Sequence, residues 1–248
     1  MTLVIASFVT MPCRAANIIR VVDSLLAQTV KPDKILVHYS TEACHLDAGW
    51  SEPPAILSSD YSVIELRCVP NLGSCRKYFF AAQEFRLRDA FLILVDDDRA
   101  WGPHVFERLI EFADRTGCVA TTRGWSDYRL KPDGAGNLIL HDEGIKASKI
   151  SVPTEVAVAN SGWATCFRPS SVRTSLFDHA IIDKAQMRHS DEVILSAMLD
   201  SPRYVVPMPK RFYADLSAPV RLWQSPIATR AKLAQLRLSP NLSVRMLP

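Results

Sequence analysis

The sequence lacks the short motifs that mark many metal and cofactor proteins. Its six cysteines include no C-x-x-C pair, which argues against a structural zinc site. The first apolar segment is followed by TMPCRAAN (10–17), which contains no glycine, whereas a dinucleotide-binding fold needs G-x-G-x-x-G at that place. No G-x-x-x-x-G-K-S/T phosphate-binding loop occurs either. A bound nucleotide must therefore be held without a glycine cradle, which favours binding through a metal ion.

Long apolar runs are missing as well. No stretch approaches the ~20 apolar residues of a membrane-spanning helix. The opening segment, residues 1–14, has no basic region before its apolar residues, so we expect a first strand there and not a secretory signal. The scattered cysteines fit a reducing compartment. Together these features predict a soluble, cytoplasmic protein.

Basic residues are concentrated near the C-terminus, although the net charge of the chain is only +3. From residue 203 onward there is one acid, Asp215, while the basic residues are Arg203, Lys210, Arg211, Arg221, Arg230, Lys232, Arg237 and Arg245. We expect a solvated tail or one that faces an acidic partner; the alternative is a positive surface for phosphate groups or an anionic membrane. A helix expected at 227–238 could pack on the domain, pair with a second subunit or lie on a membrane. No nucleic-acid-binding signature accompanies the tail.

Strands and helices are predicted to alternate through residues 1–122. Apolar runs predict strands, and apolar residues at helical spacing predict helices between them. The strands are expected at 3–9, 34–39, 62–68, 90–95 and 118–122, and the helices at 15–27, 73–88 and 103–115. Such alternation predicts an α/β fold with a mostly parallel central sheet flanked by helices.

The second half of the sequence no longer shows regular alternation of strands and helices, and we expect a small antiparallel portion there. Turn-forming residues are frequent in 126–162. Short strand candidates lie at 137–140, 155–159 and 162–168. A helix is expected at 191–200, and Pro202 is expected to end it. We therefore expect one domain over residues 1–205 and a basic, proline-containing extension over 206–248.

Three consecutive aspartates, Asp96 to Asp98, follow the most apolar predicted strand. Ligands of parallel sheets bind beyond the carboxyl ends of the strands, and adjacent carboxylates are costly unless a cation lies among them. Mg²⁺ and Mn²⁺ prefer carboxylate oxygens and often share their coordination with substrate phosphates. Because side chains at i and i+2 of an extended segment share one side, Asp96 and Asp98 could converge on one ion while Asp97 turns to a hydrogen-bond partner. The alternative is a solvated acidic loop at the rim of the sheet.

Six segments occur in an order that is shared with one group of enzymes. They are VTMPCR (9–14), NLGSCRKYFFAA (71–82), LVDDDRAWGPHVFERLIE (94–111), TTRGW (121–125), NSGWATCFRPSSV (160–172) and SDEVILSAML (190–199). In this order they resemble family-2-like glycosyltransferases of the GT-A type, in particular the subgroup that contains bacterial surface-polysaccharide and chlorovirus capsid glycosyltransferases. The resemblance implies a GT-A (Rossmann-like) fold with a nucleotide-binding half at about 1–122 and an acceptor half at about 123–205. It also implies metal-dependent transfer of a sugar from a nucleotide-diphosphate sugar to a hydroxyl of a glycan, polysaccharide or glycoconjugate.

The resemblance assigns the metal contacts. Asp98 matches the last acid of the D-x-D motif and would bind Mn²⁺ or Mg²⁺, while Asp96 would approach the metal or the ribose. Asp97 would support the nucleotide site beside them. The cation would neutralise the diphosphate leaving group. No histidine follows His189, so the later metal-binding histidine of many GT-A enzymes has no match in this sequence.

The resemblance also assigns the nucleotide contacts. Thr10, Pro12 and Arg14 would lie where such enzymes bind the nucleotide. Lys77 would reach a phosphate or the sugar. The alternatives are a surface arginine at a helix start for Arg14 and a solvated helix lysine for Lys77.

The pair Asp191-Glu192, followed by an apolar helix, resembles the E-D pair of inverting GT-A enzymes. An inverting transfer needs a carboxylate that takes the proton of the acceptor hydroxyl. The apolar register aligns Glu192 with this base and Asp191 with a neighbour that would contact the acceptor, but the exchanged identities leave both open. Acids in the first turn of a helix also cap exposed amides without any catalysis. Trp163 and Trp125 could each stack on a sugar or belong to the core.

Other functions stand as alternatives to sugar transfer with inversion. A retaining mechanism depends on geometry and stays open. A sugar nucleotidyltransferase usually has a glycine-rich, basic loop after its first strand, which TMPCRAAN does not supply. A non-catalytic module that binds a nucleotide sugar or a carbohydrate would have lost the D-x-D motif or the base, and both are present.

Overall fold

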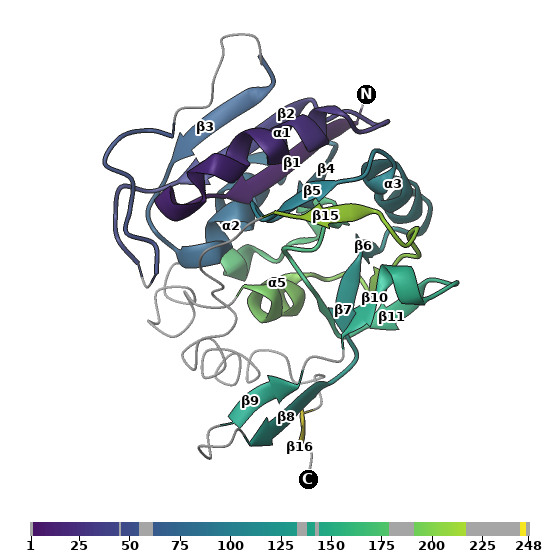
Figure 1. The fold of residues 1–248 in the computed structure, drawn as a ribbon. Coiled ribbons are helices and arrows are strands. Elements are labelled where there is room, and N and C mark those ends of the chain that lie inside the picture. The colour runs from purple at the N-terminus through teal and green to yellow at the C-terminus, as the bar shows by residue number, and fades with distance from the viewer. Residues whose placement is uncertain are drawn as a thin grey trace.

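An eight-stranded sheet forms the centre of the protein (Figure 1). The computed structural model describes residues 2–44, 46–54, 62–132, 138–141, 144–178, 191–216 and 244–246. From one edge of the sheet to the other, the strands are β11 (Thr154–Val156), β14 (Arg203–Val205), β6 (Val119–Thr121), β13 (Thr165–Phe167), β4 (Ala90–Leu94), β1 (Leu3–Val9), β2 (Lys34–Tyr39) and β3 (Ile64–Cys68).

Most neighbouring strands of this sheet run parallel. β1 pairs in parallel with β2 and β4, β2 with β3, and β6 with β14. β13 runs antiparallel between β4 and β6, and β11 is antiparallel to β14 at one edge. The predicted mostly parallel sheet with an antiparallel portion from the second half is confirmed.

Helices cover both faces of the sheet. They are α1 (Ile18–Leu26), α2 (Arg76–Phe85), α3 (Val105–Thr116) and α5 (Glu192–Met198). Because alternate residues of a strand point to opposite faces, Val4, Ala6 and Phe8 of β1 join one core cluster with α1 and α3. Ile5 joins a second cluster with α2 and α5. In the described part of the chain, no helix combines the length and the apolar character that crossing a membrane requires.

Shorter elements complete the fold. The 3₁₀ helices are η1 (Pro12–Asn17), η2 (Gly73–Cys75), η3 (Ala147–Lys149), η4 (Pro169–Ser171) and η5 (Thr174–Phe177). Small sheets join β10 (Ile145–Lys146), β7 (Arg123–Trp125) and β12 (Val158–Ala159); β5 (Arg99–Trp101) and β15 (Tyr213–Asp215); and β16 (Val244–Met246), β8 (Tyr128–Pro132) and β9 (Leu138–His141). Since η1 and η2 lead into α1 and α2, the helices predicted at 15–27 and 73–88 each begin with a 3₁₀ turn.

The sequence does not predict the pairing of β5 with β15. The two strands are antiparallel, and Leu216 N donates a hydrogen bond to Asp98 O (2.8 Å) just beyond them. Phe212, which precedes β15, is buried in the core. Residues 206–216, assigned from sequence to the extension, therefore pack with the domain. The helix predicted at 227–238 lies outside the described residues.

His38 is a buried titratable group of β2. Its Nδ1 lies 3.2 Å from Ser7 Oγ, which in turn donates a hydrogen bond to the carbonyl oxygen of Lys77 (2.5 Å). Burial, together with the positive charges of Arg67 and Arg76, lowers the pKa of His38 from 6.5 to about 3. The folded protein therefore holds this imidazole in its neutral form.

The free energy of unfolding is expected to fall as the pH drops below 6.5, because the unfolded chain binds a proton on His38 that the folded protein does not. The folded-state pKa is the lower one, so this contribution to stability is complete above 6.5 and is lost as the pH falls toward about 3. One such group costs about 1.4 kcal/mol per pH unit. Urea titrations at several pH values should show a flatter pH dependence for His38→Gln than for the wild type. Equal slopes for the wild type and His38→Gln would contradict this assignment.

Candidate active site

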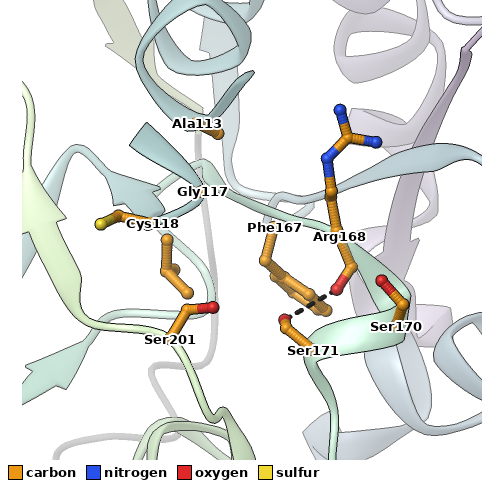
Figure 2. A pocket seen from close by; sticks show the side chains of 9 residues that line it. Ala113, Gly117, Cys118, Phe167, Arg168, Ser170, Ser171 and Ser201 are labelled. Carbon is orange, nitrogen blue, oxygen red and sulfur yellow. Dashed lines mark hydrogen bonds between the residues drawn. The ribbon is translucent and has the colours of Figure 1, made fainter. Parts of the chain in front are cut away.

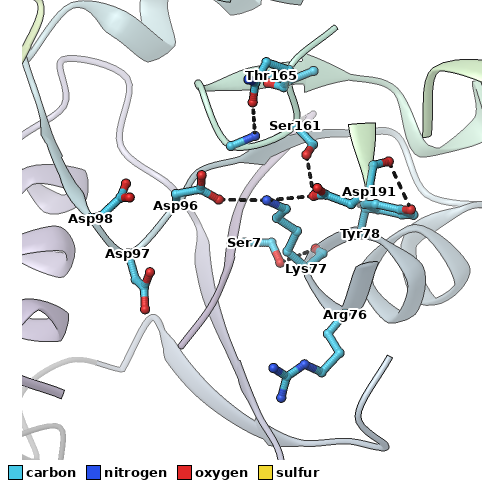
Figure 3. Close-up of polar contacts among 12 residues, drawn as sticks. Ser7, Arg76, Lys77, Tyr78, Asp96, Asp97, Asp98, Ser161, Thr165 and Asp191 are labelled. Carbon is cyan, nitrogen blue, oxygen red and sulfur yellow. Dashed lines mark hydrogen bonds and ion pairs between the residues drawn. The ribbon is translucent and has the colours of Figure 1, made fainter. Parts of the chain in front are cut away.

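The three consecutive aspartates follow β4 at the carboxyl end of the parallel strands, where they face different partners (Figure 3). Asp97 points away from the other two, as the alternation of side chains predicts. Arg14 Nη1 lies 2.5 Å from Asp97 Oδ1, and both side chains are buried. Burial raises the pKa of Asp97 to about 6, although the charge and hydrogen bond of Arg14 act in the opposite direction. Asp97 therefore ties Arg14 to the end of β4.

The predicted nucleotide contacts Thr10, Pro12 and Arg14 gather at the carboxyl end of β1. Thr10 N donates a hydrogen bond to His38 O (3.0 Å), which joins this segment to the neighbouring strand. Pro12 begins η1, whose turn brings Arg14 to Asp97. Because Thr10 and Arg14 are both buried, the interpretation of Arg14 as a surface arginine is wrong.

Lys77 joins the D-x-D motif to the predicted base (Figure 3). Its Nζ lies 2.7 Å from Asp96 Oδ1 and 2.9 Å from Asp191 Oδ2. The Lys77 side chain is only 3% exposed, so the interpretation of a solvated helix lysine is wrong. Burial would lower the pKa of Lys77, but the charges of Asp191 and Asp96 raise it above its ordinary value, so the amine stays protonated. Two acids that are far apart in the sequence therefore meet at one buried cation.

The side chain of Asp191 points into this site and does not cap its helix. Asp191 is the N-cap residue of α5, yet it makes no capping hydrogen bond with its side chain. Ser161 donates a short hydrogen bond to Asp191 Oδ2, the oxygen that also contacts Lys77. The interpretation of Asp191 as a simple helix cap is therefore wrong. Glu192, the first residue of α5, is buried as well.

The loop that carries Ser161 lies directly against Asp96. A Cβ atom added to Gly162 would lie 1.8 Å from Asp96 Oδ2, so the Asp96 carboxylate would have to move away from any larger residue there. Gly162 N donates a hydrogen bond to Asn160 Oδ1 (3.0 Å), and the Thr165 hydroxyl donates one to the Asn160 carbonyl oxygen (2.7 Å). Glycine at this position therefore allows the loop to approach the Asp96 carboxylate closely.

The carboxylates of Asp96 and Asp98 both lie near one positively charged side chain. Arg99 Nη1 lies 2.8 Å from Asp98 Oδ1 and 3.6 Å from Asp96 Oδ2. Burial raises the pKa of Asp98, and the charge of Asp96 raises it further, so a positive charge shared between the two carboxylates is stabilising. Within the described ranges, no three His, Cys, Asp or Glu side chains are grouped to hold a metal. The two carboxylates fit a Mg²⁺ or Mn²⁺ ion that takes its other ligands from phosphate oxygens and water.

The two tryptophans near the site contact arginine side chains. Arg99 Cζ lies 4.4 Å and Arg123 Cζ 4.8 Å from the ring centre of Trp163, and Arg123 Cζ lies 5.5 Å from that of Trp125. The ring of Tyr213 in β15 meets Trp163 edge to face at 4.9 Å between centres. Both tryptophans are buried. These contacts favour a place in the core over sugar stacking for both.

A separate pocket of about 200 Å³ lies beside the start of β6 and the end of β13, at the amino end of the parallel strands (Figure 2). Its lining includes Cys118, which precedes β6, and Arg168, which follows β13. Arg168 Nη1 lies 2.7 Å from Asp89 Oδ1, and Asp89 immediately precedes β4. Among the residues that the structure describes, no predicted site residue lines this pocket. The aspartate site and this pocket are therefore distinct.

No protein-family model and no curated protein matches the sequence. Among solved structures, the chain is similar to S. aureus TarS 1–349 in complex with UDP, with 14% identity and a TM-score of 0.50. It is also similar to TarS 1–349 in complex with UDP-GlcNAc, with 13% identity and a TM-score of 0.47. The alignments cover 96% and 91% of this chain but 64% and 61% of the TarS chain, so the protein spans less than two thirds of TarS 1–349. At this identity the likeness shows a shared fold.

Proposed function

We propose that the protein is a metal-dependent glycosyltransferase that moves a sugar from a nucleotide-diphosphate sugar to a hydroxyl of a glycan, polysaccharide or glycoconjugate. The observation that carries this proposal is the contact of Lys77 with both Asp96 and Asp191. One acid belongs to the motif expected to hold the donor, and the other precedes the helix expected to supply the base. Sugar transfer needs the donor site and the base close to the same anomeric carbon. The fold shared with TarS in complex with UDP makes a uridine nucleotide the first donor to test.

The donor side would be built from the ends of β1 and β4. Asp98 and Asp96 would hold Mn²⁺ or Mg²⁺, and the bound ion supplies Lewis-acid stabilisation of the diphosphate as it leaves. Thr10, Pro12 and Arg14 would contact the nucleotide. Because Arg14 is held in place by an ion pair, its charge needs no rearrangement to stabilise the leaving group.

The acceptor side would depend on Asp191. Lys77 and Ser161 both contact its Oδ2, which makes Oδ1 the oxygen that would take the proton of the acceptor hydroxyl. As this proton moves, the acceptor oxygen bonds to the anomeric carbon, and the bond from that carbon to the diphosphate breaks with its electron pair. Attack opposite to the leaving group inverts the configuration. Glu192 is the second candidate for the base because the apolar register of α5 favours it.

Metal-dependent nucleotide binding tests the proposal. In a thermal-shift screen of nucleoside diphosphates and UDP-sugars we expect stabilisation that requires Mn²⁺; a ligand at about 100 times its Kd adds roughly 2.7 kcal/mol. Asp98→Asn should lose this stabilisation, whereas Arg168→Gln, at the amino end of the parallel strands, should keep it. NMR of the anomeric product then separates inversion from retention. No metal-dependent stabilisation by any nucleotide would count against the proposal.

A further inference from the structure

Arg99 is the counter-cation of both carboxylates that are predicted to hold the metal. Its Nη1 lies 2.8 Å from Asp98 Oδ1 and 3.6 Å from Asp96 Oδ2. The side chains of Arg99, Asp98 and Asp96 are 13%, 19% and 33% exposed, so these contacts are partly solvated. A divalent cation between Asp96 and Asp98 would lie close to this guanidinium, and like charges repel more strongly there than in bulk water.

The guanidinium is held in this position from two other sides. Its Cζ lies 4.4 Å from the ring centre of Trp163, and its Nε lies 3.6 Å from Asp215 Oδ1. Asp215 is delivered by the pairing of β15 with β5, which also places Leu216 N on Asp98 O. The Asp215 side chain is 72% exposed, so water weakens its attraction for the guanidinium. Arg99 is therefore kept beside the D-x-D carboxylates while an exposed acid lies on its other side.

Each aspartate of the triplet already has a cationic partner. Lys77, Arg14 and Arg99 each form an ion pair with a different aspartate. A divalent cation alone would add two positive charges close to these three cations. A nucleotide diphosphate brings the compensating negative charge, and its phosphate oxygens can pair with a guanidinium in bidentate fashion. Cation and donor together therefore suit this site better than either one alone.

We propose that Arg99 competes with the divalent cation for Asp96 and Asp98, and that the diphosphate of the donor relieves this competition by taking over the guanidinium. The inference rests on the proposed function, since it assumes that the metal binds at the D-x-D motif. Metal affinity should be low until a diphosphate is present. By thermodynamic linkage, the metal should raise the affinity for the diphosphate by the same factor. The site would thus take up its metal and its donor as a pair.

Mn²⁺ binding, followed by EPR of the unbound ion, tests this competition without an activity assay. Arg99→Gln removes the charge and is expected to bind Mn²⁺ about tenfold more tightly than the wild type when no nucleotide is present. UDP should raise the Mn²⁺ affinity of the wild type far more than that of Arg99→Gln. Arg99→Lys keeps the charge and should resemble the wild type. Arg99→Met, whose stem still covers Trp163, repeats the charge removal if the glutamine variant folds poorly.

Arg168→Gln is the matched control for these variants. Arg168 also pairs with two aspartates, Asp89 and Asp114, at 2.7 Å each, and also lies over an aromatic ring, Phe91, at 4.3 Å. Its replacement should leave Mn²⁺ binding unchanged. If the wild type binds Mn²⁺ with UDP and both neutral Arg99 variants bind the ion no more tightly without it, the competition is refuted and the proposed function stands. If the wild type binds no Mn²⁺ even with UDP, the proposed metal site itself is refuted.

Discussion

Asparagine in place of Asp191 is expected to lower the turnover number for sugar transfer by about a thousandfold, as the loss of a general base does. Asparagine keeps the shape of the side chain and can still accept hydrogen bonds from Lys77 and Ser161, but it cannot take a proton. Mn²⁺-dependent nucleotide binding, measured by thermal shift, and the KM for the donor should therefore change little. A large loss in turnover with intact binding is the signature of a group that acts only in the chemical step.

Two further variants decide whether Asp191 or Glu192 is the base. Glu192→Gln should cost much less activity than Asp191→Asn if the geometry around Lys77 identifies the base correctly. Ser161→Ala removes one hydrogen bond from Asp191 Oδ2 and leaves the carboxylate in place, so we expect a small loss from it. A loss confined to Glu192→Gln would transfer the role to Glu192. Full activity in both carboxylate variants would remove the base from α5 altogether.

The parallel part of the sheet could be predicted from the sequence, whereas β5 and β15 could not. β1 and β4 carry nearly continuous apolar residues because helices cover both faces of the sheet, and such runs are typical of buried parallel strands. β5 begins with the charged Arg99, and β15 ends with the exposed Asp215. Their stability comes from pairing with each other across a long sequence separation. Neither composition nor alternation marks such a pair, so the sequence predicts residues 206–216 as part of the extension.

Part of the candidate site could likewise be predicted from the sequence, and part could not. The D-x-D acids and the Asp191-Glu192 pair follow from local patterns, because each stands next to an apolar strand or helix. The contact that joins these acids does not follow from a local pattern, because the position of Lys77 between two carboxylates depends on how α2 packs beneath the sheet. The roles of Ser161 and Gly162 could not be predicted for a similar reason, because they arise only where the loop meets Asp191 and Asp96. For Arg99, the local signal was a basic residue placed directly after three acids.

Methionine in place of Lys77 is expected to lower the free energy of unfolding by about 3 kcal/mol at neutral pH, because breaking a buried ion pair leaves an uncompensated charge. The value lies at the low end of the usual range because the Asp96 side chain is 33% exposed and partly solvated. Lys34→Met is the matched control. Lys34 pairs with Glu65 at the surface, where its side chain is 38% exposed, so its loss should cost less than about 1 kcal/mol. Urea denaturation of both variants measures the difference.

A double variant separates the charge of Lys77 from the packing of its stem. The raised pKa of Lys77 keeps the wild-type amine charged at every pH below 10.5. In Lys77→Met, Asp96 and Asp191 lose the cation that they share. Asp191→Asn added to Lys77→Met should restore part of the stability because it removes the buried charge that the lysine compensates. A loss that Asp191→Asn does not relieve would mean that Lys77 does not couple the two acids.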